Sequence, residues 1–375
     1  MKTKNSNKSL LVMIGNSKLG GLERRYSKAF AKLQEKNHNS FLVVNQDLYN
    51  GLLQHSIISS STPNIFIVKQ KTSFKSFKTP LKFQLFAAFE ILKIVLKHRI
   101  NNLHLVQTQI LISSILTLFP VKNKIITFAH TDFDPGYERG LKRLLLKFVL
   151  ARVNRIDFLS NDIKNKYLKK YPLLSDQTEN LVTPCSYIDY EKFIPGEKHK
   201  TIISLSRLDP IKNTKLLVEA IHIIINERKL SLDGYKCLIL GDGPCKEELE
   251  ELIKRYSIGK YVELGYAFNP VDYLKHSTIF VSIQQTNNYP SQSLIEAMAC
   301  ENAVIASDVG ETRLLVDEQN GVLVELNSEI IADAILSLIQ NPVLLDLLRL
   351  NSRSKVLCTH TIENFLGYLV NSLYR

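Results

Sequence analysis

The sequence predicts an α/β protein made of two doubly wound domains, each built on a parallel sheet. Three observations support this fold class. The chain has 375 residues, which is more than one ordinary hydrophobic core accommodates. Short apolar runs alternate with amphipathic stretches along most of its length, as in parallel α/β sheets. The charge also changes: residues 1–190 carry 29 Lys and Arg against 12 Asp and Glu, whereas residues 191–375 carry 19 against 24.

The first half begins with a βαβ unit. An apolar run at 10–15 is stopped by a glycine, residues 22–37 have helical periodicity, and 40–45 is the next strand. A helical crossover between two strands predicts that they are parallel. Further strands are expected at 64–68, 103–108, 124–130 and 155–160, and helices at 80–98, 109–118 and 138–152. We assign residues 1–190 to an N-terminal Rossmann-like domain.

A second alternating series follows a linker. Residues 183–200 contain prolines and a glycine and show no clear period, which indicates an interdomain connection. Strands are expected at 201–206, 236–243, 261–266, 278–283, 302–307 and 321–325, and helices at 214–228 and 244–256. We assign residues 191–360 to a C-terminal Rossmann-like domain and 361–375 to an apolar-faced helix. Two such domains are expected to face each other across a cleft.

Composition limits the class of protein. Hydrophobic residues make up 45% of the chain, which argues against disorder. Five cysteines without a Cys-x-x-Cys pair predict reduced thiols in a cytoplasmic protein. We expect neither a signal peptide nor a membrane-spanning helix, because no uncharged apolar run reaches about 18 residues. The basic half predicts an anionic partner, namely nucleic acid, a phosphorylated ligand or a membrane surface, with solubility alone as the plain alternative.

Two loops at the expected carboxyl edges of the sheets could bind an anion. Gly20 and Gly21 lie between the first strand and first helix, where a ligand can approach the backbone, although a tight turn explains them equally. The loop SRLDPIKN brings Arg207 and Lys212 to a helix start, where two cations repel unless an anion such as phosphate binds both. Solvated surface charges are the alternative. We interpret GDGP (241–244) as a structural turn.

His130 ends an expected strand and is followed by two carboxylates. A histidine at this edge could bind substrate or transfer a proton, or it could be a hydrogen-bonded, partly buried residue. Asp132 and Asp134 with one histidine are weak evidence for a metal, and we predict no metal site.

Residues 287–299 read NNYPSQSLIEAMA and contain one carboxylate in an apolar helix. Ser293 and Glu296 have the S-x-x-E form of a capping box, so Glu296 could cap its own helix. Alternatively, the helix start faces a ligand, its N–H groups meet a phosphate, and Glu296 accepts hydrogen bonds from ribose hydroxyls. The residues alone leave both interpretations open.

Taken together, these motifs resemble the retaining, nucleotide-sugar-dependent glycosyltransferases of GT-B fold in glycosyltransferase family 4, the glycosyl transferases group 1 type. The resemblance covers most of the chain and is strongest over 201–325. The motifs that carry it, in order, are GGLE (20–23), SRLDPIK (206–212), GDGP (241–244), NNYPSQSLIEAMA (287–299), DVGETRLLV (308–316) and NGVLV (320–324).

The resemblance implies a role for each matching residue. Arg207 and Lys212 would neutralise the departing diphosphate, Glu296 would hold the ribose, and His130 would lie on the acceptor side near the transferred sugar. Backbone groups near the phosphates would come from Gly20, Gly21, Ser293 and Leu294. Asn288 stands where the family has its first acid, and we expect its amide to bind the donor sugar.

The resemblance also implies that residues 1–190 bind the acceptor and that residues 191–360 bind the donor. The helix at 361–375 would pack back on the N-terminal domain, with a plain amphipathic tail as the alternative. The implied function is the retaining transfer of a sugar from a UDP- or GDP-sugar to a glycan or lipid-linked acceptor, without a metal or another cofactor. The product would belong to surface polysaccharide synthesis of the lipopolysaccharide or capsule type. The basic first domain would rest on the anionic inner face of the cell membrane, which makes the protein cytoplasmic and peripheral. A GT-B sugar-nucleotide epimerase is one alternative, although the sequence offers few acid–base groups for it. A nucleic-acid-binding protein is another, although no aromatic-interleaved basic run is visible.

Overall fold

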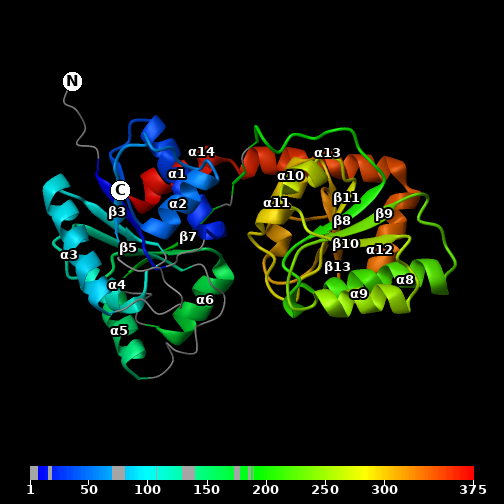
Figure 1. The fold of residues 1–375 in the computed structure, drawn as a ribbon, viewed down its shortest axis with the longest axis horizontal. Helices are drawn as coiled ribbons and strands as arrows, with labels where there is room; N and C mark the ends of the chain where they lie inside the picture. The colour runs from blue at the N-terminus through cyan, green and yellow to red at the C-terminus, as the bar shows by residue number, and fades with distance from the viewer. Residues whose placement is uncertain are drawn as a thin grey trace. The chain divides into compact units, whose positions relative to one another are not determined.

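The computed structural model describes residues 7–15, 19–69, 81–106, 108–128, 140–172, 178–184, 187–188 and 190–375. The chain forms two compact units, one of Met1–Pro184 with Glu363–Arg375 and the other of Cys185–Ile362 (Figure 1). The sequence predicts these boundaries at 190 and 360. Each unit is a parallel sheet with helices, so the predicted α/β class is confirmed.

The first unit has a seven-stranded parallel sheet of strand order β3-β2-β1-β4-β5-β6-β7 within its described residues. Its strands are β1 (Ser9–Met13), β2 (Ser40–Asn45), β3 (Ile65–Val68), β4 (Asn102–Leu105), β5 (Asn123–Phe128), β6 (Arg155–Phe158) and β7 (Glu179–Val182). The strand order changes direction between β1 and β4, which makes this position the topological switch point. The short strand β7 was not among the predicted elements.

Helices cover this sheet and are labelled in Figure 1. They are α1 (Gly21–Glu35), α2 (Gln46–Gln54), α3 (Leu81–His98), α4 (Ile110–Leu116), α5 (Gly140–Leu150), α6 (Asn161–Lys170) and, from the end of the chain, α14 (Ile362–Tyr368) with the π-helical turn Leu369–Leu373. One apolar core joins the sheet to α3, α4 and α5. Leu10 and Val12 of β1 point into this core, and by strand alternation His104 of β4 points to the opposite face.

That opposite face contains a buried polar network around Asp157 of β6. The Asp157 carboxylate accepts hydrogen bonds from Tyr26 of α1 at 2.5 Å, from Thr183 at 2.8 Å and from Tyr368 of α14 at 2.6 Å. It also accepts one from Thr127 at 3.1 Å. The last residues of the chain are therefore held in the first unit by a buried carboxylate.

The second unit has a six-stranded parallel sheet of strand order β10-β9-β8-β11-β12-β13. Its strands are β8 (Thr201–Leu205), β9 (Lys236–Leu240), β10 (Val262–Gly265), β11 (Ile279–Ser282), β12 (Ala303–Ser307) and β13 (Gly321–Val324). The chain builds outward from β8 to β10 and then returns to pair β11 with β8, so the switch point lies between these two strands. The six strands match the six predicted for this half.

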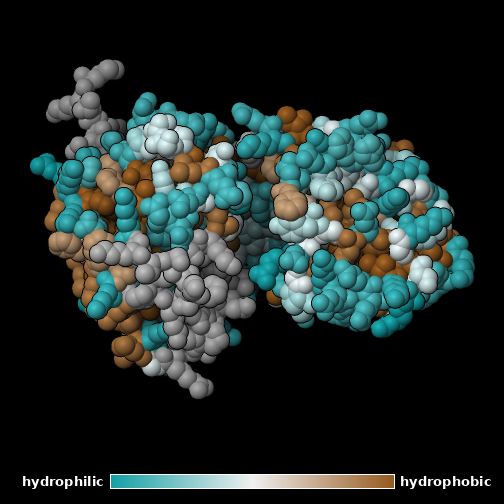
Figure 2. Space-filling model, in the orientation of Figure 1, coloured by the Kyte–Doolittle hydropathy of each residue, from teal (hydrophilic) through white to brown (hydrophobic). Residues whose placement is uncertain are grey.

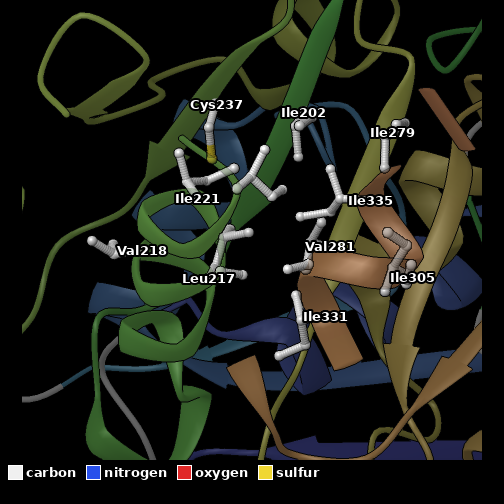
Figure 3. Close-up of a cluster of buried hydrophobic side chains, with 14 of the residues drawn as sticks. Ile202, Leu217, Val218, Ile221, Cys237, Ile279, Val281, Ile305, Ile331 and Ile335 are labelled. Atoms are coloured by element: carbon white, nitrogen blue, oxygen red, sulfur yellow. The ribbon is translucent and has the colours of Figure 1, made fainter. Parts of the chain in front are cut away.

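The helices of the second unit close its core. They are α8 (Thr214–His222) with the π-helical turn Ile223–Glu227, α9 (Lys246–Arg255), α10 (Pro270–Leu274), α11 (Gln292–Ala299), α12 (Ser328–Gln340) and α13 (Pro342–Thr359). Figure 3 shows branched side chains of α8 and α12 meeting those of the central strands, with the buried thiol of Cys237 beside them. This core fixes the strands whose carboxyl ends form the candidate site. Among the described residues no single helix is long and apolar enough to cross a membrane. The segments Ser328–Gln340 and Pro342–Leu373 reach that length and apolar composition only when taken together, and the chain bends by 101° between them.

Candidate functional site

The candidate site of the second unit lies at the switch point between β8 and β11. Lys212, in the loop after β8, donates a hydrogen bond from Nζ to the Oε1 atom of Gln284, in the loop after β11. The backbone N–H of Gln285 also donates to the Ile211 carbonyl at 2.7 Å. The two loops are therefore joined where ligands bind in open α/β sheets. The partner Gln284 was not predicted from the sequence, because it is 72 residues away along the chain.

The electrostatics of the β8 loop differ from the expectation of two unbalanced cations. Arg207 is exposed and is held by Asp209, with Nε to Oδ2 at 3.1 Å and Nη2 to Oδ1 at 3.2 Å. Lys212 is half-buried, and burial lowers its pKa, while the charge of Asp209 raises it and that of Arg207 lowers it. Asp209 is thus the resting counter-charge that sequence analysis missed, although it stands in the same motif.

The GDGP turn supports this loop by close backbone contact. A Cβ atom on Gly241 would lie 1.9 Å from the Ser206 carbonyl oxygen, so the loop can approach only a glycine. The Leu208 N–H donates to Asp242 O at 3.0 Å, and the Cys245 N–H donates to Leu208 O at 2.9 Å. These contacts agree with the structural interpretation of GDGP.

Helix α11 begins after the residue Ser291, and this excludes the capping box. Ser293 is the second helical residue and Glu296 the fifth, so neither occupies its capping position and that interpretation is wrong. The Ile295 N–H is the first to bond back, to Ser291 O at 3.1 Å, and the Ser291 side chain makes no capping bond. The N–H groups of the first turn, including those of Ser293 and Leu294, therefore lie outside the helical ladder. Leu294 is fully buried, so a contact between its backbone and a ligand stays a prediction.

Glu296 is half-buried one turn into α11. Its Oε1 accepts a hydrogen bond from Gln292 Nε2 at 3.0 Å, and the same amide donates to the Tyr187 carbonyl at 3.2 Å. Gln292 therefore orients the carboxylate and ties the helix start to the segment that enters this unit. Its role was not predicted, since a glutamine four residues before an acid has no distinctive sequence signal.

Asn288 is buried beside the end of β11. Only 1% of the residue is exposed. Its Nδ2 donates to Ser282 Oγ at 2.9 Å and to Ser282 O at 3.2 Å, and its Oδ1 accepts from Ser282 Oγ at 3.3 Å. In this arrangement Asn288 stabilises the loop against the end of β11, and sugar binding by its amide stays a prediction.

The adjacent residue Asn287 connects this loop to the segment DVGET. Its Oδ1 accepts hydrogen bonds from the N–H groups of Tyr289 at 3.1 Å and Glu311 at 2.9 Å. A Cβ on Gly310 would lie 2.8 Å from Asn287 Cβ, and φ of Gly310 is +55°, so both space and backbone require glycine. Three loops at the carboxyl edge of the second sheet are thus linked to one another.

The first unit contains the predicted glycine pair after β1, at its own switch point. Gly20 precedes α1, and its N–H donates to the buried carboxylate of Glu23 at 3.0 Å. A Cβ on Gly21 would meet nothing within 4 Å, which leaves its backbone open to approach. His130 lies outside the described residues, as do Asp132 and Asp134. A cleft shared by the two units stays a prediction.

Comparison with known proteins places the second unit beside a known family. Residues 199–341 match the family model described as glycosyl transferases group 1. The matched residues contain Arg207, Lys212, Gln284 and Glu296, so the similarity lies in the unit that carries the candidate site.

The chain is similar to two enzymes of Campylobacter jejuni and one of Erwinia amylovora. The N-acetylgalactosamine-N,N'-diacetylbacillosaminyl-diphospho-undecaprenol 4-alpha-N-acetylgalactosaminyltransferase is 36% identical over 135 residues, 35% of each chain. The GalNAc-alpha-(1->4)-GalNAc-alpha-(1->3)-diNAcBac-PP-undecaprenol alpha-1,4-N-acetyl-D-galactosaminyltransferase is 30% identical over 61% of this chain and 62% of its own. The amylovoran biosynthesis glycosyltransferase AmsD is 24% identical over 86% of each chain. The chain thus spans about a third of the length of the first relative and just under two thirds of the length of the second.

Solved structures show the fold of this chain. A glycosyltransferase from Rickettsia africae has a TM-score of 0.75 at 18% identity, covering 99% of this chain and 98% of its own. Anabaena Alr3699/HepE, solved with UDP and glucose, has a TM-score of 0.75 at 13% identity, covering 98% and 99%. The two parallel α/β units are those of the GT-B glycosyltransferase fold, as the sequence predicts.

Proposed function

We propose that this chain is a retaining glycosyltransferase that moves a sugar from a nucleotide-sugar donor to a glycan or lipid-linked glycan acceptor. The observation that carries the proposal is the Lys212–Gln284 hydrogen bond, which holds a half-buried cation at the switch point of the second sheet. The names of two relatives describe transfer to glycans on diphospho-undecaprenol, and a third acts in amylovoran biosynthesis. These names favour a role in surface polysaccharide synthesis, of the lipopolysaccharide or capsule type.

The chemistry follows from the charge that develops on the leaving group. When the bond between the sugar and the donor diphosphate breaks, negative charge collects on the diphosphate. Lys212, Arg207 and the N–H groups at the start of α11 stabilise this charge. A bound diphosphate favours the protonated lysine and therefore raises the Lys212 pKa, which burial lowers in the free protein. A fixed group aimed at such charge typically contributes about 3–4 kcal/mol, or roughly 10²–10³ in kcat.

The remaining site residues bind the donor and the acceptor rather than neutralise the leaving group. Glu296, oriented by Gln292, accepts hydrogen bonds from the ribose hydroxyls, and a carboxylate can do so because hydroxyls are donors. Gly21 offers its backbone to the phosphates, and His130 acts on the acceptor side near the transferred sugar. We propose no metal and no cofactor besides the donor, since the fixed cations supply the charge that a metal would otherwise provide.

We also propose where this reaction takes place. The balance of +17 in residues 1–190 favours association with the anionic inner face of the cell membrane, where lipid-linked acceptors lie. The protein is then cytoplasmic and peripheral. The nucleotide of the donor is proposed as UDP or GDP.

The test is a donor screen on purified protein with the Lys212→Met variant as the decisive comparison. Nucleotide release from UDP- and GDP-sugars is measured with and without extracted lipid-linked acceptors, and NMR of the product gives its anomeric configuration. Lys212→Met should lower kcat by about 10²-fold or more. The matched control is Lys215→Met, which removes a nearby cation paired with Glu248 at 3.4 Å on the surface and should leave kcat unchanged.

Two results would contradict the proposal. If the Lys212→Met variant turned over as fast as the wild type, Lys212 would not stabilise the leaving group and the assigned site would be wrong. Conversion of a nucleotide sugar into its epimer without any acceptor would indicate the alternative, a sugar-nucleotide epimerase.

A further inference from the structure

Helices α3 and α5 of the first unit expose large apolar side chains on their outer faces. Those on α3 include Leu85 (53% exposed), Phe86 (48%), Phe89 (57%) and Leu96 (59%). Leu141 (69%) and Leu144 (64%) are on α5. The inward side chains of both helices belong to the apolar core, and the exposed ones do not contribute to it.

The two helices belong to one layer, because each packs against α4. Figure 2 shows apolar and hydrophilic side chains mixed over this part of the first unit, at the left of the view. We name this surface the α3–α5 face, and it comprises Lys82, Leu85, Phe86, Phe89, Lys93, Leu96, Lys97, Leu141, Lys142, Arg143, Leu144 and Lys147.

The cations of the α3–α5 face accompany its apolar side chains. The six exposed Lys and Arg residues of the face compare with one acid in the two helices, Glu90. Glu90 is paired with Lys93 at 2.7 Å, and the ammonium of Lys93 also lies 4.3 Å from the centre of the Phe89 ring. Helix α5 itself contains no acid. The face is therefore both apolar and strongly positive.

We infer that the α3–α5 face docks on an anionic lipid bilayer. Leucine and phenylalanine enter the boundary between headgroups and acyl chains, while lysines extend along them to lipid phosphates. Helix α3, at 18 residues, presents about 27 Å of such surface. A second copy of this chain fits less well, because pairing two such faces would bring cations against cations. Nucleic acid would use the charge but not the leucines and phenylalanines.

This inference gives the membrane partner of the proposed function a defined surface. It can fail independently of that function, because vesicle binding requires neither donor, acceptor nor turnover.

The experiment is flotation of the full-length protein with vesicles of pure phosphatidylcholine or with 30% phosphatidylglycerol. We expect binding to the anionic vesicles, weakening as salt rises. The apolar variant Phe86→Gln with Phe89→Gln should reduce the partition coefficient by at least about tenfold. The charge variant Lys142→Gln with Lys147→Gln should reduce it by about 25-fold at low salt, since each lysine near an anionic surface contributes about fivefold.

The matched control is an equally exposed apolar pair in the second unit. Leu347 (53% exposed) and Leu350 (58%) lie on α13, and Leu347→Gln with Leu350→Gln should bind vesicles as the wild type does. Circular dichroism and thermal unfolding of every variant show whether its fold is kept, which surface substitutions should allow.

Three results would overturn the inference. The first is a wild type that does not float with anionic vesicles at low salt. The second is an apolar variant that binds like the wild type. The third is a wild type that is dimeric by light scattering and becomes monomeric in the apolar variant with no loss of flotation, because the face would then join two copies of the chain.

Discussion

Tyr368→Phe removes one hydroxyl from the buried network that holds the end of the chain. In the wild type the Tyr368 hydroxyl donates to Asp157 Oδ1 at 2.6 Å, and Thr183 donates to the same oxygen at 2.8 Å. The other oxygen accepts from Tyr26 at 2.5 Å and Thr127 at 3.1 Å. The substitution keeps the ring and its packing, so the hydrogen bond is the main loss.

The size of the effect follows from the charge of the acceptor. Burial raises the pKa of Asp157, and the four hydroxyls lower it. The ionised carboxylate is therefore costly in the core, and each hydroxyl offsets part of that cost. A hydrogen bond to a charged group contributes about 1.5–3 kcal/mol, so we expect the free energy of unfolding to fall by about 2 kcal/mol at pH 7. For a unit of this size that corresponds to about 4–8 °C in Tm.

The pH dependence gives the effect a sign that can be checked. A raised folded-state pKa means that the native state binds more protons than the unfolded state between the ordinary pKa of 3.8 and its own value. The contribution of Asp157 to stability is thus greatest at low pH and is lost as pH rises through the folded pKa. Losing the Tyr368 hydroxyl raises that pKa further. The difference between variant and wild type should therefore shrink as pH falls, because a protonated carboxyl binds the hydroxyl less strongly.

The measurement is urea unfolding of both proteins from pH 7 down to the lowest pH at which the wild type stays folded. Tyr49→Phe is the control, since Tyr49 is a half-buried tyrosine of α2 in the same unit and its hydroxyl lies outside the Asp157 network. A loss below 0.5 kcal/mol at pH 7, on the order of a surface substitution, would refute the reasoning. So would a loss that grows as pH falls.

Two further predictions concern the loop after β8. Gly241→Ala should raise the KM for the donor and lower the free energy of unfolding, because its Cβ would lie 1.9 Å from the Ser206 carbonyl oxygen. The control Gly259→Ala meets only an ordinary 3.8 Å contact and should change neither quantity. Steady-state kinetics and thermal unfolding measure the two effects. An unchanged KM in Gly241→Ala would mean that the loop does not position the donor. Asp209→Asn should tighten UDP binding by about two- to fivefold in calorimetry, since the acid that pairs with Arg207 no longer competes with the diphosphate. Weaker binding would show instead that Asp209 is needed to orient the arginine.

The sequence predicted the elements that depend on neighbours along the chain. Strands such as 201–206 and 302–307 are short apolar runs, and helix 244–256 has acids at its start and bases at its end, so local periodicity and the helix dipole suffice to locate them. The order of the loops that follow these strands then predicted the family and the residues Arg207, Lys212 and Glu296. Elements with weaker patterns, such as the four-residue strand β7, were not predicted.

Tertiary structure decided which groups meet. The local pattern left two interpretations of the start of α11 open, because Ser293 and Glu296 fit a capping box. The structure excludes the capping box, since the loop before these residues is tied to Ser282 and Glu311 and the N-cap is Ser291. Asp209 is two residues from Arg207 in the sequence, but only the structure shows that the two side chains form an ion pair. Gln284 reaches Lys212 only because β11 returns to pair with β8.

The Asp157 network makes the same point at longer range. Its hydroxyls come from positions 26, 127, 183 and 368, which no local pattern connects. Local sequence determines the type of each element, because propensity and periodicity act over a few residues. Packing determines which side chains are buried together, because burial and hydrogen bonding act between residues that only the completed fold brings into contact.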